Sequence, residues 1–292
     1  MQSSKSVSPS RASRYLNWLL VSPTIVILAF FLILPLLTIA VVSFWDYNEW
    51  TFFPAFIFDN YIYLLESPVT WATYLKTLKF TLLTWMFCTL IGFTVAFFLA
   101  FHVRSLTWQI TLFLVCTIPF WTSNIIRMIS WIPFLGRNGI ANSSLISLGV
   151  IDEPLDWLLF SDFAVVLAFV HLYTLFMVVP VFNTMMRIDK TLIEAARDAG
   201  ASGIQILINV ILPLSRPGLM IGSIFVVTLV MGDFITVRFM SGGQSASVGR
   251  VISNEIALLQ YPAAAASAVI LLITVLIMIA IMLRFVDIRK EL

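Results

Sequence analysis

The chain has 292 residues, of which 60% are apolar and only 11% are charged, and its mean hydropathy is +1.00. This balance lies well outside that of a soluble domain, because no aqueous core could hold so many apolar side chains. The formal net charge of +2 is too small to indicate affinity for nucleic acid. We therefore predict an all-α integral membrane protein.

The chain opens with a serine-rich segment, residues 3–13, which predicts a disordered tail. Lys5, Arg11 and Arg14 precede a long apolar run, an order that resembles a secretory signal. The run is far longer than the roughly 7–15 apolar residues of a signal peptide, and no small-x-small cleavage site ends it. We therefore expect a cytoplasmic tail, residues 1–14, followed by a retained first span.

Six apolar runs are long enough to cross a bilayer, at roughly 20 residues per helical crossing. They cover residues 16–44, 78–101, 108–131, 163–186, 210–235 and 263–285. Together they predict one six-helix transmembrane domain over residues 15–286, followed by a cytoplasmic tail, residues 287–292.

The basic residues are divided unevenly among the hydrophilic segments. The N-terminus and the second, fourth and final segments hold eleven basic and five acidic residues, whereas the remaining positions hold six basic and ten acidic residues. Because short cytoplasmic segments carry an excess of Lys and Arg, we predict that both termini are cytoplasmic.

Two segments on the expected outer side are long enough to fold. Residues 46–77 are rich in Trp, Phe and Tyr, which suits a helix lying at the membrane interface. Residues 132–162 are more polar and contain the turn signal Asn138-Gly139. Either segment could contact a periplasmic partner or simply close the outer face.

Three ionisable residues interrupt the apolar runs: Arg127, His171 and Asp233. Such a side chain is costly in a membrane unless it is paired or faces a water-filled cavity. For Arg127 and Asp233, a mutual ion pair, snorkelling to the interface and a place on a transport pathway all remain open. For His171, the alternatives are a neutral ring that is hydrogen-bonded to a neighbouring helix and a substrate contact.

A hydrophilic module lies between the fourth and fifth runs, at about residues 187–213. Thr191 with Glu194, and Ser202 with Gln205, have the spacing of a capping box, so each pair predicts the start of a short helix. Gly200 falls between them, where a left-handed turn is easiest for glycine. The pattern predicts either a rigid cytoplasmic docking element or an ordinary pair of short helices.

The docking alternative is favoured by a resemblance. The order Glu194-Ala195-Ala196, Gly200 and Leu212-Pro213, with every spacing kept, resembles the EAA motif of permease subunits of binding-protein-dependent ABC importers. Val210 stands where that family usually has Ile.

A narrower resemblance is to the spermidine/putrescine-type permease subfamily. It rests on two regions: Pro119-Phe120-Trp121-Thr122-Ser123 with Arg127, Trp131, Leu135-Gly136, Asn138-Gly139 and Asn142; and Gly232-Asp233-Phe234-Ile235-Thr236 with Gly242-Gly243. Val237 replaces the usual proline after the threonine.

The resemblance implies a type I ABC importer-like permease fold in a bacterial inner membrane. Its partners would be a second permease subunit, forming a heterodimer, a dimer of ATP-binding subunits that hold ATP and Mg, and a periplasmic solute-binding protein. The coupling helix that contacts the ATPase would include Glu194, Ala195, Ala196, Gly200, Leu212 and Pro213.

Catalytic and metal-binding motifs are absent from the sequence. It has no Walker-type loop, no H-E-x-x-H and no Cys or His pair at metal spacing, and Cys88 and Cys116 lie apart in separate apolar runs. We therefore expect a transport subunit with no catalytic site, no metal and no cofactor of its own.

The resemblance also gives candidates for the substrate pathway, namely Trp121, Arg127, Asp233 and Thr236. Asp233 and Trp121 would favour a polyamine through charge pairing and cation–π contact, whereas an unpaired Arg127 on the same cavity would favour an anionic or zwitterionic solute. An opine, aminoethylphosphonate or amino-acid derivative is therefore an alternative substrate. A secondary transporter or channel is the alternative of another class, although only Asp233 resembles a coupling carboxylate and no internal repeat is visible.

Overall fold

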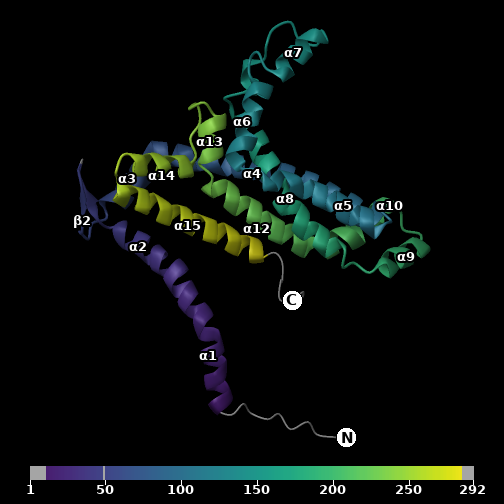
Figure 1. Cartoon of the computed structure of the whole chain (residues 1–292), viewed down its shortest axis with the longest axis horizontal. Helices are drawn as coiled ribbons and strands as arrows, with labels where there is room; N and C mark the ends of the chain where they lie inside the picture. Colours follow the sequence, from purple (N-terminus) through teal and green to yellow (C-terminus); the bar gives the residue numbers. More distant parts are fainter. Residues whose placement is uncertain (1–10, 49, 285–292) are drawn as a thin grey trace.

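The computed structural model describes residues 11–48 and 50–284 and shows an elongated bundle of helices (Figure 1). The predicted C-terminal tail, residues 287–292, and residues 1–10 of the predicted N-terminal tail lie outside the described residues. The first helix, α1 (Arg11–Leu28), begins inside the stretch that we expected to be tail.

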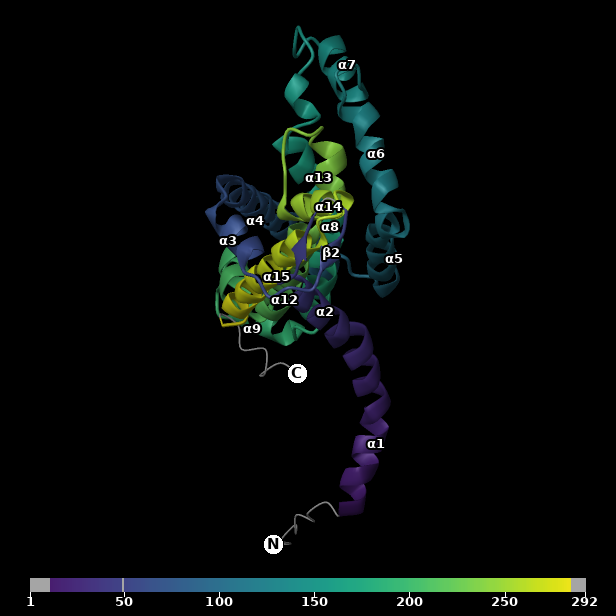
Figure 2. The ribbon, with the colours of Figure 1, turned by 90° about the vertical axis from the view of Figure 1, so that its left-hand side faces the viewer.

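The N-terminal rod consists of α1, the π-helical turn η1 (Ala29–Ile33) and α2 (Leu34–Val42). The wider π turn comes just before Pro35, whose ring would clash with a carbonyl of the preceding α-helical turn. Its membrane-length segment, Leu19–Val42, is 0% buried within the chain, and Figures 1 and 2 show the rod leaving the bundle.

A short hairpin follows, in which β1 (Asp46–Tyr47) pairs antiparallel with β2 (Phe52–Phe53). The aromatic segment then forms α3 (Asp59–Glu66), so the interfacial helix that we predicted over residues 46–77 is much shorter than expected. The second span, α4 (Pro68–Phe97), begins ten residues before the predicted start at residue 78. Its start is set by Ser67, whose side chain accepts the backbone N–H of Thr70, and by a proline in the first turn.

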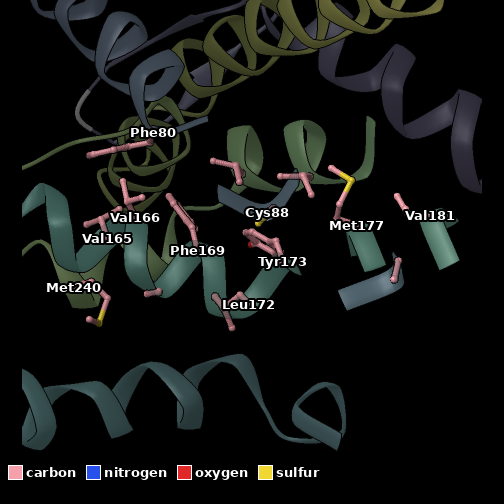
Figure 3. Close-up of a cluster of buried hydrophobic side chains, with 14 of the residues drawn as sticks. Phe80, Cys88, Val165, Val166, Phe169, Leu172, Tyr173, Met177, Val181 and Met240 are labelled. Atoms are coloured by element: carbon pink, nitrogen blue, oxygen red, sulfur yellow. The ribbon is translucent and has the colours of Figure 1, made fainter. Parts of the chain in front are cut away.

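Three helices form the centre of the bundle: α4, α8 (Asp162–Met185) and α12 (Arg216–Gly232). Figure 3 shows Phe169, Tyr173 and Met177 following one another along α8 in this core. A Cβ placed at Gly92 on α4 or at Gly222 on α12 would lie 2.6 Å from a side-chain atom of Met177. The small residues therefore allow the three helices to approach closely, as is common between membrane helices.

The third predicted run, residues 108–131, is not a straight helix. It contains α5 (Leu106–Thr117), the 3₁₀ turn η3 (Ile118–Trp121) and the first part of α6 (Asn124–Leu135). The chain bends by 88° between the α5–η3 segment and the segment that holds α6 and α7 (Ile140–Ser147). Pro119 and the extended backbone of Thr122 and Ser123, with ψ of 148° and 139°, explain the break.

The fifth predicted run, residues 210–235, is also divided. The chain forms α10 (Gly203–Ile206), η5 (Leu207–Ile211) and α11 (Leu212–Leu214), then bends by 64° into α12. The helix α12 ends at Gly232 because Asp233 has an extended backbone, and α13 (Ile235–Met240) follows.

The fourth and sixth runs match α8 and α15 (Tyr261–Arg284), and α14 (Val248–Ala257) packs beside the start of α15. The described chain thus has four helices that are long and apolar enough to cross a membrane, or up to six spans if each bent pair counts as one. The exact count of six and the cytoplasmic position of both termini stay predictions.

Candidate functional site

The predicted docking module lies at the end of the bundle opposite the β-hairpin (Figure 1). Its first helix is α9 (Lys190–Asp198). The N-cap is Asp189, whose Oδ1 accepts the Thr191 backbone N–H at 2.9 Å, so the predicted Thr191–Glu194 capping box is wrong. An aspartate two residues upstream offers a charged acceptor and displaces the threonine from the cap. The same hydrogen bond lowers the pKa of Asp189.

The elbow and the second cap of the module are confirmed. Gly200 has a φ of +84°, and the Ala201 N–H donates to the Ala196 carbonyl at 3.0 Å, which closes the end of α9. Ser202 Oγ accepts the Gln205 N–H at 3.3 Å, and Gln205 Oε1 accepts the Ser202 N–H at 2.7 Å. The chain therefore leaves α9 and enters α10 through a tightly defined turn.

The two alanines of the motif do not share one surface. Ala195 is exposed, whereas Ala196 is half-buried and packs against the hydrophobic core. Glu194 lines a groove of about 380 Å³ between α9 and the turn η2 (Phe98–His102) that ends α4. The surface open to a partner is therefore formed by Glu194 and Ala195, with Leu212 exposed and Pro213 half-buried after the elbow.

A second site surrounds Asp233, at the far end of α12 from the module. Its Oδ2 accepts hydrogen bonds from the Tyr173 hydroxyl at 2.5 Å and the Thr236 hydroxyl at 2.7 Å. Its Oδ1 accepts the Thr236 backbone N–H at 2.8 Å, so the carboxylate also caps the first turn of α13. The half-buried Asp233 still lines a cavity of about 320 Å³, together with Asn124, Tyr173 and Thr228.

Two other pathway candidates have quite different positions. Thr236 is 0% exposed and contacts Asp233, so any effect on a solute would act through the carboxylate that it holds. Trp121 is 83% exposed at the break between η3 and α6. It is not among the residues that line the Asp233 cavity.

Arg127 and Asp233 do not form an ion pair within the part of the chain that the structure describes. Arg127 is 8% exposed, and its Nη2 donates to Asn124 Oδ1 at 2.5 Å. It lines a separate cavity of about 350 Å³ between α4, α5, α6 and α8. Of the alternatives left open for the two charges, the mutual ion pair is therefore not formed. They line different cavities because Asn124 and Met128 occupy the face of α6 towards Asp233, whereas Arg127 and Trp131 occupy another face.

His171 lies on the Arg127 cavity, and its Nδ1 accepts the indole N–H of Trp131 at 3.1 Å. An indole only donates, so this ring nitrogen carries no proton and the ring is neutral. The first alternative for His171, a neutral ring bonded to a neighbouring helix, is confirmed.

A groove on the exposed face of α8 and α12 was not apparent from the sequence. Near the module it widens to about 730 Å³, lined by residues that include Asn183, Arg187 and Phe225. Towards Asp233 it meets an aromatic cluster in which the Phe176 ring lies 6.2 Å from Phe225 and 6.3 Å from Tyr173. Exposed positions 221, 225, 228 and 232 on α12 have helical spacing, but an apolar run does not reveal which of its faces is open.

Another acidic side chain that the sequence did not single out is Glu255 on α14. The Ser267 hydroxyl donates to its Oε1 at 3.3 Å, while its buried Oε2 has no partner in the described chain. Burial raises the pKa of Glu255.

Among the described residues, no three His, Cys, Asp or Glu side chains come together as metal ligands would. The absence of a resident metal or cofactor stays an expectation.

No family model matches the chain. Known permeases do resemble it over most of its length. Spermidine/putrescine transport system permease protein PotB of Escherichia coli K12 is 34% identical over 259 residues, covering 87% of this chain and 92% of that protein. PotB of Haemophilus influenzae is 35% identical over 233 residues, covering 78% and 79%. Inner membrane ABC transporter permease protein YdcU of E. coli K12 is 28% identical over 266 residues, covering 86% and 82%.

Solved structures with low sequence identity share the fold. A chain of a bacterial alginate ABC transporter, crystallised with an alginate pentasaccharide-bound periplasmic protein, superposes with a TM-score of 0.73 at 15% identity and covers 96% of both chains. A second bacterial ABC transporter, involved in the import of alginate, gives 0.71 at 17% identity and covers 94% of this chain and 96% of that one.

Proposed function

Because this chain belongs to the family of spermidine/putrescine transport system permease proteins and is a permease subunit of an ABC importer, we propose that it forms half of a transport pathway for a polyamine. The observation that carries the proposal is the fixed carboxylate of Asp233 on an open cavity. Two hydroxyls and one backbone amide hold it in place, so a cationic amine would meet an acceptor that needs little reorganisation.

The surroundings of Asp233 suit an amine with alkyl segments. Tyr173 and Phe234 line the same cavity, and aromatic faces attract cations that have lost part of their water. The Phe176–Phe225 contact lies between this cavity and the wide groove near the module. We assign it the role of a constriction that separates the two ends of the pathway, with Trp121 exposed for contact with the solute or the second subunit.

The module around Gly200 is the proposed contact for the ATPase. Two ATP-binding subunits, which carry ATP and Mg, would bind the exposed side chains of Glu194, Ala195 and Leu212 and the accessible part of Pro213. Binding can shift the permease only if the ATPase has different affinities for its two conformations. The defined elbow at Gly200 supports this role, because a rigid contact transmits a tilt better than a loose loop.

The remaining partners follow from the same proposal. The chain would lie in the bacterial inner membrane in a type I importer architecture with both termini cytoplasmic and a periplasmic binding protein at the outer face. A second, similar permease subunit would cover the open face of α8 and α12, which carries Ile221, Phe225 and Thr228 exposed at helical spacing. The chain itself would have no catalytic site. Membership of the ABC permease family leaves the secondary transporter and channel without support.

The test is ATP-dependent uptake by the whole complex in proteoliposomes, with binding protein loaded with spermidine. Asp233→Asn keeps the shape but removes the charge, and we expect it to lower uptake about tenfold or more, since removing one member of a charged contact costs at least about 1.4 kcal/mol. Asp156→Asn is the matched control, because Asp156 lies on the surface and its ion pair among the described residues is with Arg137. Equal spermidine uptake by both variants would contradict the proposal.

A second candidate substrate is a small anionic or zwitterionic solute such as aminoethylphosphonate, an opine or an amino-acid derivative. Arg127 favours it, because Asn124 both accepts from Arg127 and lines the Asp233 cavity. Uptake of aminoethylphosphonate that survives Asp233→Asn but not Arg127→Gln would support this candidate over a polyamine.

A further inference from the structure

We propose that the cavity lined by Arg127 binds an anionic phospholipid, with the lipid phosphate at the guanidinium and an acyl chain between α4, α5 and α8. This cavity is separate from the one that Asp233 lines.

The charge of Arg127 is not balanced within its cavity. Arg127 is nine-tenths buried, and none of the residues that line its cavity is an Asp or Glu. A guanidinium has five N–H donors, yet its side-chain partner in the described chain is the neutral amide oxygen of Asn124, and its buried Nε has no partner. An uncompensated cation is costly within a membrane protein. An anion from outside the chain would remove that cost.

His171, a polar neighbour of Arg127 on this cavity, also offers a hydrogen-bond donor. Trp131 donates to His171 Nδ1, so the neutral ring carries its proton on Nε2 and can only donate from that atom. The Thr174 hydroxyl donates its proton to the Val170 carbonyl at 2.6 Å, so it has no donor left for an anion. The free donors of Arg127 and of His171 Nε2 suit the oxygens of a phosphate.

The apolar wall of the cavity distinguishes a lipid from a small free anion. Apart from these few groups, the cavity wall is apolar, with Val95, Leu167, Leu175 and Val178 along its length. Ile91 and Phe120 belong both to the wall and to the exposed surface of the helices, so the cavity opens sideways towards the lipid. Inorganic phosphate would use only the Arg127 end, whereas a phospholipid would fill both the polar and the apolar part.

The experiment uses the purified, assembled transporter in detergent. It is titrated separately with dioleoyl phosphatidylglycerol and dioleoyl phosphatidylcholine, and bound lipid is counted by native mass spectrometry. We expect one phosphatidylglycerol-selective site for each copy of this chain. Arg127→Gln should lower the affinity for phosphatidylglycerol about tenfold or more, because one charge-assisted phosphate contact is lost, while binding of phosphatidylcholine stays unchanged.

Two further variants keep the test decisive if Arg127→Gln fails to assemble. Arg127→Lys keeps the charge and should retain selectivity for phosphatidylglycerol, and Leu175→Trp should fill the apolar part and weaken binding of that lipid. Arg238→Gln, which removes an exposed arginine on α13, is the control for general surface charge and should bind as the unmodified chain does.

The proposal is overturned if Arg127→Gln or Leu175→Trp binds phosphatidylglycerol with unchanged affinity. It is also overturned if inorganic phosphate at millimolar concentration displaces the lipid, since the site would then recognise a small anion and the apolar wall would have no part in binding.

Discussion

Replacing Gly200 by valine should uncouple ATP hydrolysis from transport while leaving membrane insertion intact. Gly200 has a φ of +84°, a region in which a residue other than glycine costs about 1–3 kcal/mol, and a β-branched residue is among the least tolerated. Apart from the adjacent residues, no atom lies within 4 Å of a Cβ built at this position, so backbone strain acts without a steric clash. A strain of about 2 kcal/mol shifts the equilibrium between the native elbow and looser turns roughly 30-fold.

The assay measures solute uptake and ATP hydrolysis in proteoliposomes that contain the whole transporter. We expect Gly200→Val to lower the uptake per ATP hydrolysed about tenfold, because a loosened elbow no longer moves α10 and α12 with α9. Gly200→Asn should retain much more coupling, since asparagine tolerates left-handed backbone better than valine.

Two other glycines provide matched controls. Gly149→Val places the same strain at a φ of +69° in a turn far from the module, also with no atom within 4 Å. Gly203→Ala changes a glycine inside the module that has no positive φ and open space around its Cβ. Both should couple normally. Normal coupling in Gly200→Val, or equal losses in Gly149→Val, would refute the reasoning.

Three further predictions concern stability. Gly218→Ala should lower the unfolding temperature of the complex, because its Cβ would lie 2.5 Å from the Pro180 carbonyl oxygen on α8. Such overpacking should lower the free energy of unfolding by about 1–3 kcal/mol. An unchanged unfolding temperature would contradict the close approach of α8 and α12. The N-cap of α9 should be complete above about pH 4, the ordinary range of an aspartate. It should be lost as pH falls through the lowered pKa of Asp189, so the backbone amides of α9 should then exchange faster. In Asp189→Ala, the exchange of these amides should lack this pH dependence. Burial raises the pKa of Glu255, so the free energy of unfolding should fall as pH rises above about 4.3 and the side chain ionises. Thermal melting of Glu255→Gln should lack this pH dependence. A variant that keeps it would show that Glu255 is not responsible.

Much of the fold can be predicted from the apolar runs. The breaks within those runs depend on single residues that the hydropathy of the run does not reveal. The fourth and sixth runs match α8 and α15 because nothing within them removes the helical geometry, apart from the tolerated Pro180. The third run looks equally apolar, but Pro119 and the extended Ser123 turn it by nearly a right angle. Hydropathy records how apolar a segment is and does not record its direction.

The module was predicted well because its signals are local. The left-handed turn at Gly200 and the cap of Ser202 with Gln205 depend on a few adjacent residues. The prediction for the first cap was wrong because two possible acceptors lie within three positions, and Asp189 forms the cap instead of Thr191.

The surroundings of Asp233 were predicted less well because their contacts join distant parts of the chain. Asp233 was recognised as an ionisable residue in an apolar run, but its partner Tyr173 lies on another helix. The separation of Arg127 from Asp233 depends on which face of α6 meets each cavity. Neither spacing nor composition carries that information.

The close packing of α4, α8 and α12 around Met177 gives the subunit a lever arm. Because α8 and α12 are in close contact at Gly218 and Gly222, these helices should tilt as one body and keep the Tyr173–Asp233 hydrogen bond. Asp233 follows the 17 residues of α12 and so lies about 25 Å from the bend that joins α12 to the module. A tilt of about 10° at that bend would swing the carboxylate by about 4 Å, close to the van der Waals width of an alkyl chain. The protein would thus widen or close its passage by moving an unchanged binding surface.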